Sequence, residues 1–148
     1  MASDKILERT PFTGSVINPV DSEDLLSFLQ QNGIISPDFF PIKSGRNSRV
    51  WHVQNSKGKW ILKEYYRHPE DPEDRLRTEF QFLEFLHNNY LNRVPTPIAC
   101  SQRMNLGLYS MLSGIPVKKI TDSHIEQSSD FVVKINSLRS LPEAKLLA

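Results

Sequence analysis

The sequence predicts an α+β fold, either one domain or one lobe of a larger one, from a chain of 148 residues. Three features support this prediction. Strand-like runs at residues 50–53 and 60–66 lie on either side of the turn Ser56-Lys57-Gly58, which indicates a hairpin. A helix with strong start signals follows the hairpin. Two more strand-like runs, 98–101 and 106–112, come after that helix.

The charge composition argues against a nucleic-acid-binding protein. The chain has 18 basic and 17 acidic residues and a net charge of +1, whereas binding by phosphate neutralisation needs an excess of positive charge. No apolar run approaches the length of a membrane span, and the N-terminus lacks the apolar core of a signal peptide. The single cysteine, Cys100, cannot form an internal disulfide. We therefore expect a cytoplasmic protein without a nucleic-acid or membrane partner.

The N-terminal part of the chain is expected to contain a leader, a helix and an edge strand. Residues 1–20 are polar and interrupted by prolines and a glycine, which is typical of a flexible leader. Asp21 or Ser22 can cap a helix with an apolar stripe, and Asn32-Gly33 can end it because glycine accepts a left-handed backbone. Residues 38–44 resemble a strand, and the prolines near it favour a place at the edge of the sheet.

The second strand of the hairpin carries a lysine among apolar residues. Because successive side chains of a strand point to opposite faces, Lys63 shares a face with Ile61 and Tyr65. A solvated strand face would explain an isolated lysine. A ligand-binding cleft would explain a lysine beside apolar walls.

The helix after the hairpin is expected to start at Asp71 as the N-cap, with Pro72 at the first helical position, and to run to about Tyr90. Glu79 lies at the edge of its apolar surface. An acid in this position is either exposed at a rim or paired with a cation. The rim is the commoner case, because most acidic side chains lie on the surface.

A third helix is expected near the C-terminus, after a break at Ser113-Gly114-Ile115-Pro116. The segment Thr121-Asp122-Ser123, with Glu126, can cap its start, and Pro142 is expected to end it. The residues after Pro142 are too few to build another element. The apolar positions of this helix follow helical spacing and are Ile125, Val132, Ile135 and Leu138.

The hairpin, the strand lysine and the helix acid are suited to holding a nucleotide triphosphate. A tight turn with Gly45 presents backbone N–H groups that can cradle phosphate oxygens, and Asn47 and Ser48 add side-chain donors. Lys63 can neutralise phosphates as a compact cation, and Glu79, 16 residues later, can hold it in place. A hairpin rich in Gly, Asn and Ser is on its own usually a plain turn.

The order of these motifs resembles the N-terminal lobe of the aminoglycoside phosphotransferase and choline kinase family. The resemblance covers residues 21–142, and it implies a protein-kinase-like lobe with a five-stranded antiparallel sheet and one main helix. The motifs that carry it are Gly45-Arg46-Asn47-Ser48-Arg49-Val50-Trp51, Ile61-Leu62-Lys63, Glu79, Val94-Pro95-Thr96-Pro97 and Tyr109-Ser110-Met111-Leu112-Ser113-Gly114.

The resemblance also implies roles for individual residues. Lys63 would contact the phosphates of ATP, bound as its Mg²⁺ complex, and Glu79 would orient Lys63. Val50 and Ile61 would sandwich the adenine. The other expected nucleotide-binding residues are Gly45, Arg46, Asn47 and Ser48 of the hairpin, Ser110 and Leu112 through hinge backbone hydrogen bonds, and Tyr109 behind the base.

The family's catalytic aspartate and metal-binding acids belong to a C-terminal lobe, in a His-Gly-Asp-type loop and a later acidic motif that this sequence does not match. We therefore assign no catalytic or metal-binding residue in this chain. The expected organisation is a leader at 1–20, a kinase-like lobe at 21–114, and a hinge with the first helix of a truncated second lobe at 115–148.

The intact protein is expected to transfer the γ-phosphate of ATP to a hydroxyl of a small-molecule acceptor, and this chain alone is expected to be inactive. The alternative is a non-catalytic binding module that keeps the lobe as an interaction surface. An unrelated α+β domain with a chance Lys63–Glu79 pair is a third alternative. Two structural expectations follow: Lys63 and Glu79 lie within reach of each other, and the third helix leaves an apolar stripe exposed, open to self-association.

Overall fold

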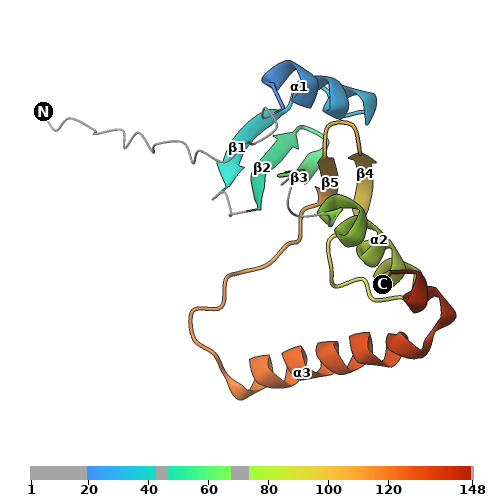
Figure 1. Cartoon of the computed structure of the whole chain (residues 1–148). Coiled ribbons are helices and arrows are strands. Elements are labelled where there is room, and N and C mark those ends of the chain that lie inside the picture. The colour runs from blue at the N-terminus through green and yellow to red at the C-terminus, as the bar shows by residue number, and fades with distance from the viewer. Residues whose placement is uncertain (1–19, 43–46, 68–73, 148) are drawn as a thin grey trace, which may run out of the picture.

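The computed structural model describes residues 20–42, 47–67 and 74–147. Their core is one five-stranded antiparallel sheet with the order β1-β2-β3-β5-β4 (Figure 1). This architecture confirms the predicted α+β class and the five-stranded sheet. The strands are β1 (Asp38–Ile42), β2 (Ser48–Asn55), β3 (Gly58–Tyr65), β4 (Pro97–Ser101) and β5 (Leu106–Ser110), and the helices are α1 (Ser22–Gln31), α2 (Arg75–Asn88) and α3 (Asp122–Ser137), followed by the short 3-10 helices η1 (Leu138–Ser140) and η2 (Pro142–Leu147).

One face of the sheet packs against α1 and forms the main hydrophobic core. Alternate residues of the central strands point to this face, as strand periodicity requires. The core contains Leu25, Phe28, Leu29, Ile34, Val53, Leu62, Leu106 and Leu108. Side chains such as Leu29 and Leu62 are fully buried, and burying a leucine stabilises a fold by about 2 kcal/mol.

An ion pair between a buried carboxylate and a partly exposed arginine lies at the edge of this core. Glu64 of β3 is 4% exposed and forms a salt bridge of 2.5 Å with Arg49 of β2. Its other oxygen accepts a hydrogen bond of 2.9 Å from the backbone N–H of Val20. The Glu64 carboxylate therefore ties the segment before α1 to the two central strands.

The opposite face of the sheet is only partly covered, because α2 packs over its β4–β5 half (Figure 1). The Phe80 ring of α2 contacts the Tyr109 ring of β5, with centroids 5.9 Å apart. The remaining part of this face, on β1, β2 and the start of β3, holds half-exposed apolar side chains such as Phe40 and Ile42. The site described below is built on this face.

The ends of α1 agree with the sequence and those of α2 differ from it. Asp21 accepts a hydrogen bond from the N–H of Asp24, and Gly33 after the helix has φ +79°. The N-cap of α2 is Asp74, not Asp71, since its side chain accepts from the Arg77 N–H at 2.9 Å. Asp71 and Pro72 lie outside the described residues.

The C-terminal end of α2 is also earlier than expected. The helix ends at Asn88, so Tyr90 is not helical: it has φ +63° and is 89% exposed. The edge strands differ in length as well. β5 ends at Ser110 rather than at residue 112, and β1 is described only to Ile42.

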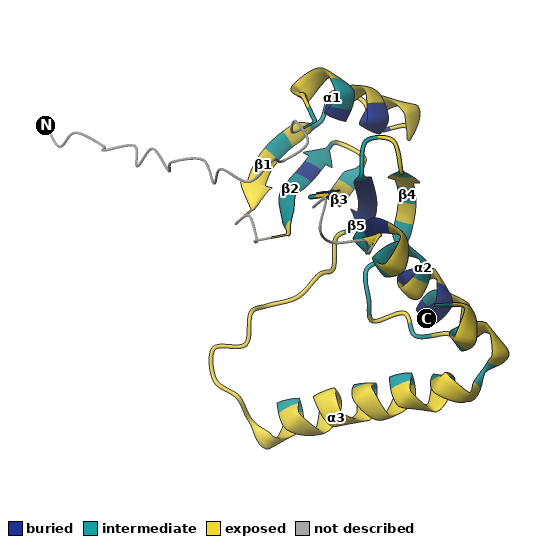
Figure 2. Cartoon of the chain, in the orientation of Figure 1, coloured by how far each residue is buried: buried dark blue, intermediate teal, exposed yellow. Residues whose placement is uncertain are grey.

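The third helix, α3, lies apart from the sheet and has no buried residue (Figure 2). Its Thr121 N–H donates to His124 Nδ1 at 3.1 Å, which caps the start. The prediction that the helix extends to Pro142 was wrong, because it ends at Ser137. Residues 142–147 do build a further element, η2, which packs against α2. None of the described helices combines the length and the apolar character needed to span a membrane.

Candidate functional site

Lys63 and Glu79 form an ion pair between β3 and α2. The Lys63 Nζ lies 2.5 Å from Glu79 Oε2, which confirms the expected proximity. The two side chains are 23% and 39% exposed. Glu79 is thus both paired and at a rim. A pair this accessible to water contributes at most about 1 kcal/mol to folding, so its main effect is to orient the lysine.

A second interaction holds the same ammonium group. Lys63 Nζ lies 4.5 Å from the centroid of the Tyr65 ring, close enough for a cation–π contact. The Tyr65 side chain points to the same face as Lys63, two residues away on β3, as the alternation predicted. The Lys63 ammonium therefore lies between a carboxylate and an aromatic face.

The strand register collects the expected adenine-contacting residues on the face that carries Lys63. Residues directly opposite each other in an antiparallel pair point to the same side. Val50 lies opposite Lys63, and Ile61 lies opposite Tyr109. Ile42 lies opposite Val50 and is 42% exposed, so it belongs to this surface too. The sequence alone does not point to Ile42, because the register between β1 and β2 cannot be derived from it.

Two buried phenols lie beneath the ion pair. The Tyr65 and Tyr109 hydroxyl oxygens are 2.8 Å apart, and these residues are 4% and 3% exposed. Burial raises the pKa of both phenols, and the nearby Glu79 carboxylate raises it further. Both groups therefore stay neutral at physiological pH and keep their hydrogen bond.

The expected hinge follows Tyr109 at the end of β5. The Ser110 N–H already donates to the Thr96 carbonyl at 2.9 Å, and its Oγ accepts from the Thr96 N–H at 2.8 Å. A ligand at this position would therefore use the Ser110 carbonyl rather than its N–H. Leu112, two residues on, is 50% exposed and accessible to a ligand.

The expected phosphate-binding hairpin is described only in part. Gly45 and Arg46 lie outside the described residues, so the structure does not test their predicted role. Asn47 is exposed and Ser48 begins β2. The Asn47 carbonyl accepts a hydrogen bond of 3.0 Å from the Tyr66 N–H, which fixes the loop end beside the end of β3.

This geometry is suited to an anionic ligand with a flat apolar part. Lys63 has three N–H donors, and Glu79 occupies one of them, so the others can reach phosphate oxygens. The apolar side chains of β1, β2 and β3 on the same face offer a surface for a base. Among residues 20–42, 47–67 and 74–147, no group of three or more His, Cys, Asp or Glu side chains is placed to hold a metal ion.

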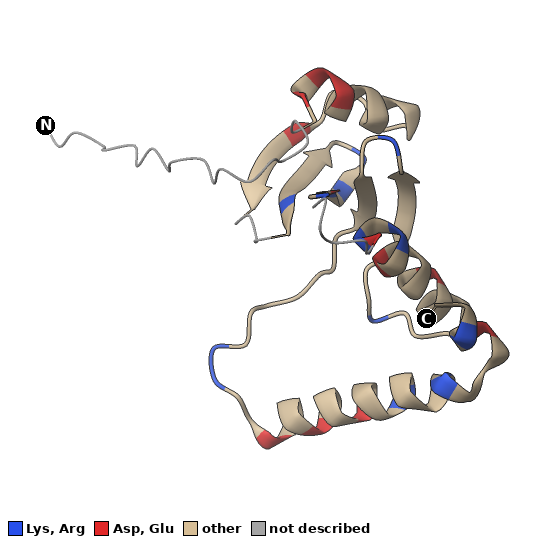
Figure 3. Ribbon diagram, in the orientation of Figure 1, with Lys and Arg blue, Asp and Glu red and all other residues tan. Residues whose placement is uncertain are grey.

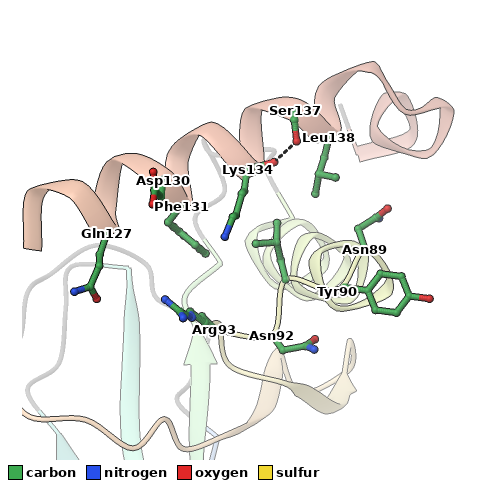
Figure 4. A pocket seen from close by; sticks show the side chains of 11 residues that line it. Asn89, Tyr90, Asn92, Arg93, Gln127, Asp130, Phe131, Lys134, Ser137 and Leu138 are labelled. Carbon is green, nitrogen blue, oxygen red and sulfur yellow. Dashed lines mark hydrogen bonds between the residues drawn. The ribbon is translucent and has the colours of Figure 1, made fainter. Parts of the chain in front are cut away.

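A separate cavity of about 610 Å³ lies between α3 and the loop after α2. Figure 4 shows Phe131 and Lys134 projecting from α3 toward Arg93 on that loop. No residue expected to bind the nucleotide lines this cavity. It is therefore distinct from the site around Lys63.

Comparison with known proteins agrees with the resemblance noted from the motifs. Residues 38–144 match the model of a family described as the phosphotransferase enzyme family. The matched segment starts at the beginning of β1 and ends within η2, so it includes Lys63 and Glu79. No curated protein gives a significant match to the chain.

Proposed function

Because the chain belongs to the phosphotransferase enzyme family, we propose that its sheet and α2 form an ATP-binding lobe. The observation that carries the proposal is the Lys63–Glu79 ion pair, at 2.5 Å on the half-open face of the sheet. A lysine oriented by a carboxylate beside an apolar surface suits the triphosphate and the base of one nucleotide. ATP would bind as its Mg²⁺ complex.

In this proposal Lys63 contacts the α- and β-phosphates while Glu79 keeps one of its N–H groups. The support is that the Lys63 side chain is partly accessible to solvent, at 23% exposed. Asn47 and Ser48, with Gly45 and Arg46 before them, would contribute hydrogen bonds to the phosphates. A phosphate at Lys63 would gain from a short, charge-assisted hydrogen bond.

The adenine would lie on the apolar part of the same face. Val50 and Ile61 would contact its rings, and Ile42 would extend that surface from β1. The Ser110 carbonyl would accept from the amino group of the base, and the Leu112 N–H would donate to a ring nitrogen. The Tyr109 ring would close the site behind the base, because it is buried against Phe80.

The reaction we propose for the intact enzyme is transfer of the γ-phosphate of ATP to a hydroxyl of a small molecule in the cytoplasm. We assign neither the catalytic base nor a metal ligand to these 148 residues. They are expected to bind ATP weakly and to transfer no phosphate, because metal and base each contribute several powers of ten in such reactions.

The proposal is tested by calorimetric titration of the purified chain with ATP and Mg²⁺, together with an ATP-consumption assay against mixed aminoglycosides and amino alcohols. Saturable ATP binding without turnover supports a nucleotide-binding lobe. Absence of binding at millimolar ATP would favour the non-catalytic alternative. Robust turnover would show that a catalytic group exists within the chain and would refute our assignment.

Self-association through α3 is a second proposal. It is supported by the exposed apolar residues Ile125 and Val132, which are 56% and 54% exposed. The first half of α3 is acidic and its end is basic (Figure 3). An antiparallel second copy would place these charges opposite each other. Sedimentation at micromolar and at higher concentration tests this, and a monomer throughout would refute it.

A further inference from the structure

We propose that Tyr65 and Tyr109 act together as positioning residues, which hold the Lys63 ammonium beside Glu79 through one phenol–phenol hydrogen bond. The role toward a nucleotide rests on the proposed function. The positioning of Lys63 itself does not, since it concerns contacts within the chain.

The Tyr65 ring lies directly below the Lys63 ammonium group. The ring forms the floor under the Lys63 ammonium, 4.5 Å from centroid to Nζ. A cation–π contact depends on the ring presenting its face, so the tilt of Tyr65 determines how well it holds the lysine. The Tyr65 ring is buried, and its hydroxyl oxygen lies 2.8 Å from that of Tyr109, which ties the end of the ring to β5.

The position of the Tyr109 phenol depends on a glycine in the same strand. The Tyr109 phenol lies over Gly107, which has no side chain. A Cβ at position 107 would come within 2.5 Å of the Tyr109 hydroxyl oxygen and 2.7 Å of a ring carbon. Gly107 lies directly opposite Lys63 in the β3–β5 pair. The missing side chain therefore provides the slot that brings the Tyr109 hydroxyl under the ion pair.

The direction of the Tyr65–Tyr109 hydrogen bond determines whether the Tyr65 hydroxyl can also donate to Glu79. A phenol has one hydrogen to donate. If Tyr109 donates to Tyr65, the Tyr65 hydrogen is free to point toward the Glu79 carboxylate, whose charge acts on both phenols. A chain of donors from Tyr109 through Tyr65 to Glu79 would hold the carboxylate when Lys63 turns to a phosphate. Removal of either hydroxyl breaks this chain.

The test measures how fast an amine-acylating reagent modifies Lys63 in the nucleotide-free chain, by peptide mass spectrometry. Lys57 and Lys59 are exposed on the same hairpin and serve as internal controls. Tyr65→Phe and Tyr109→Phe should each raise the Lys63 rate about fivefold, the size of one net hydrogen bond. The rates at Lys57 and Lys59 should not change.

The double variant should match Tyr65→Phe rather than multiply the two single effects, because the only hydrogen bond that Tyr109→Phe removes is one that Tyr65→Phe removes as well. Gly107→Ala should reproduce Tyr109→Phe, since it displaces the phenol from its slot. Tyr66→Phe is the matched control. Tyr66 follows Tyr65 directly, but apart from burial, which raises the pKa of its phenol, the charges that act on this pKa are those of Arg49 and Glu64 on the other face. It should leave the Lys63 rate unchanged.

Two outcomes would overturn the proposal. One is an unchanged Lys63 rate in both single variants, and the other is multiplicative effects in the double variant. If Tyr65→Phe fails to fold, the other two variants are used instead: an unchanged Lys63 rate in both Tyr109→Phe and Gly107→Ala would overturn the proposal. Parallel ATP titrations separate the two proposals, because a wild-type chain that binds no ATP refutes the nucleotide-binding function without affecting the lysine measurement.

Discussion

Gly107 of β5 lies directly opposite Lys63 of β3, and the space above this glycine is filled by the Tyr109 phenol. The Tyr109 hydroxyl in turn contacts that of Tyr65, whose ring lies below the Lys63 ammonium. The ammonium therefore has the Tyr65 ring on one side and the Glu79 carboxylate, 2.5 Å away, on another. The buried phenols of Tyr65 and Tyr109 and the partly exposed Lys63 side chain all belong to the pair of strands β3 and β5. The site is thus built from local strand alternation combined with one missing side chain.

Lys63→Ala should weaken ATP binding about 10- to 100-fold, the value of one charge-assisted hydrogen bond, measured by calorimetry with Mg²⁺. Lys57→Ala is the matched control, because Lys57 is an exposed lysine in the outer turn of the same hairpin. It should bind ATP as the wild type does. Equal binding by the wild type and Lys63→Ala would remove Lys63 from the site.

Glu64→Gln should lower the free energy of unfolding by about 2 kcal/mol, measured by urea denaturation. The substitution removes the charge that pairs with Arg49 at 2.5 Å, in a side chain with only 6% exposure. Glu84→Gln changes an exposed acid of α2 and should stay within about 0.5 kcal/mol of the wild type. Similar stability of both variants would show that the buried pair contributes little.

The sequence predicts the Lys63–Glu79 pair because two periodic patterns meet there. Strand alternation places Lys63 beside Ile61 and Tyr65, and helical spacing places Glu79 at the edge of the apolar surface of α2. The hydrogen bond between Tyr65 and Tyr109 could not be predicted, since it depends on the pairing of β3 with β5 across 44 residues.

The errors in element ends have local causes. The segment Asp71-Pro72-Glu73-Asp74 contains two aspartates three residues apart, and cap rules alone do not choose between them; the structure uses Asp74. By its sequence alone, Pro142 indicates the end of the last helix, with no further element after it. Proline is equally suited to the first position of a new helical turn, and η2 begins with it and packs on α2.

The stability of the fold should decrease as the pH rises above about 10. Burial raises the pKa of Tyr65 and Tyr109 above the ordinary value of 10.0, so the unfolded chain loses these protons first. The stability that the two neutral phenols contribute is complete below pH 10. Above pH 10 the free energy of unfolding falls by up to about 1.4 kcal/mol per pH unit for each phenol. Urea denaturation between pH 9 and 11 should show a smaller decrease for Tyr109→Phe than for the wild type. An identical decrease in the wild type and in Tyr109→Phe would show that the Tyr109 phenol does not cause the loss of stability.

Backbone amides of α3 should exchange with solvent much faster than those of β3 and β5 in a dilute sample, measured by hydrogen–deuterium exchange. The helix has 16 residues and no buried side chain, whereas most helical stability in proteins comes from tertiary packing of an apolar face. Ile125 and Val132 are more than half exposed as expected, whereas Ile135 and Leu138 are partly covered. Protection should therefore be lowest in the first half of α3.

The core strands provide the internal reference for that experiment, because Leu62 of β3 and Leu108 of β5 are fully buried. Exchange in α3 that slows as the protein concentration rises, with β3 unchanged, would indicate that a second copy covers the helix. Exchange independent of concentration would argue against self-association. Slow exchange throughout α3 in a dilute monomer would contradict the prediction, since a helix without buried contacts has no tertiary packing to protect its hydrogen bonds.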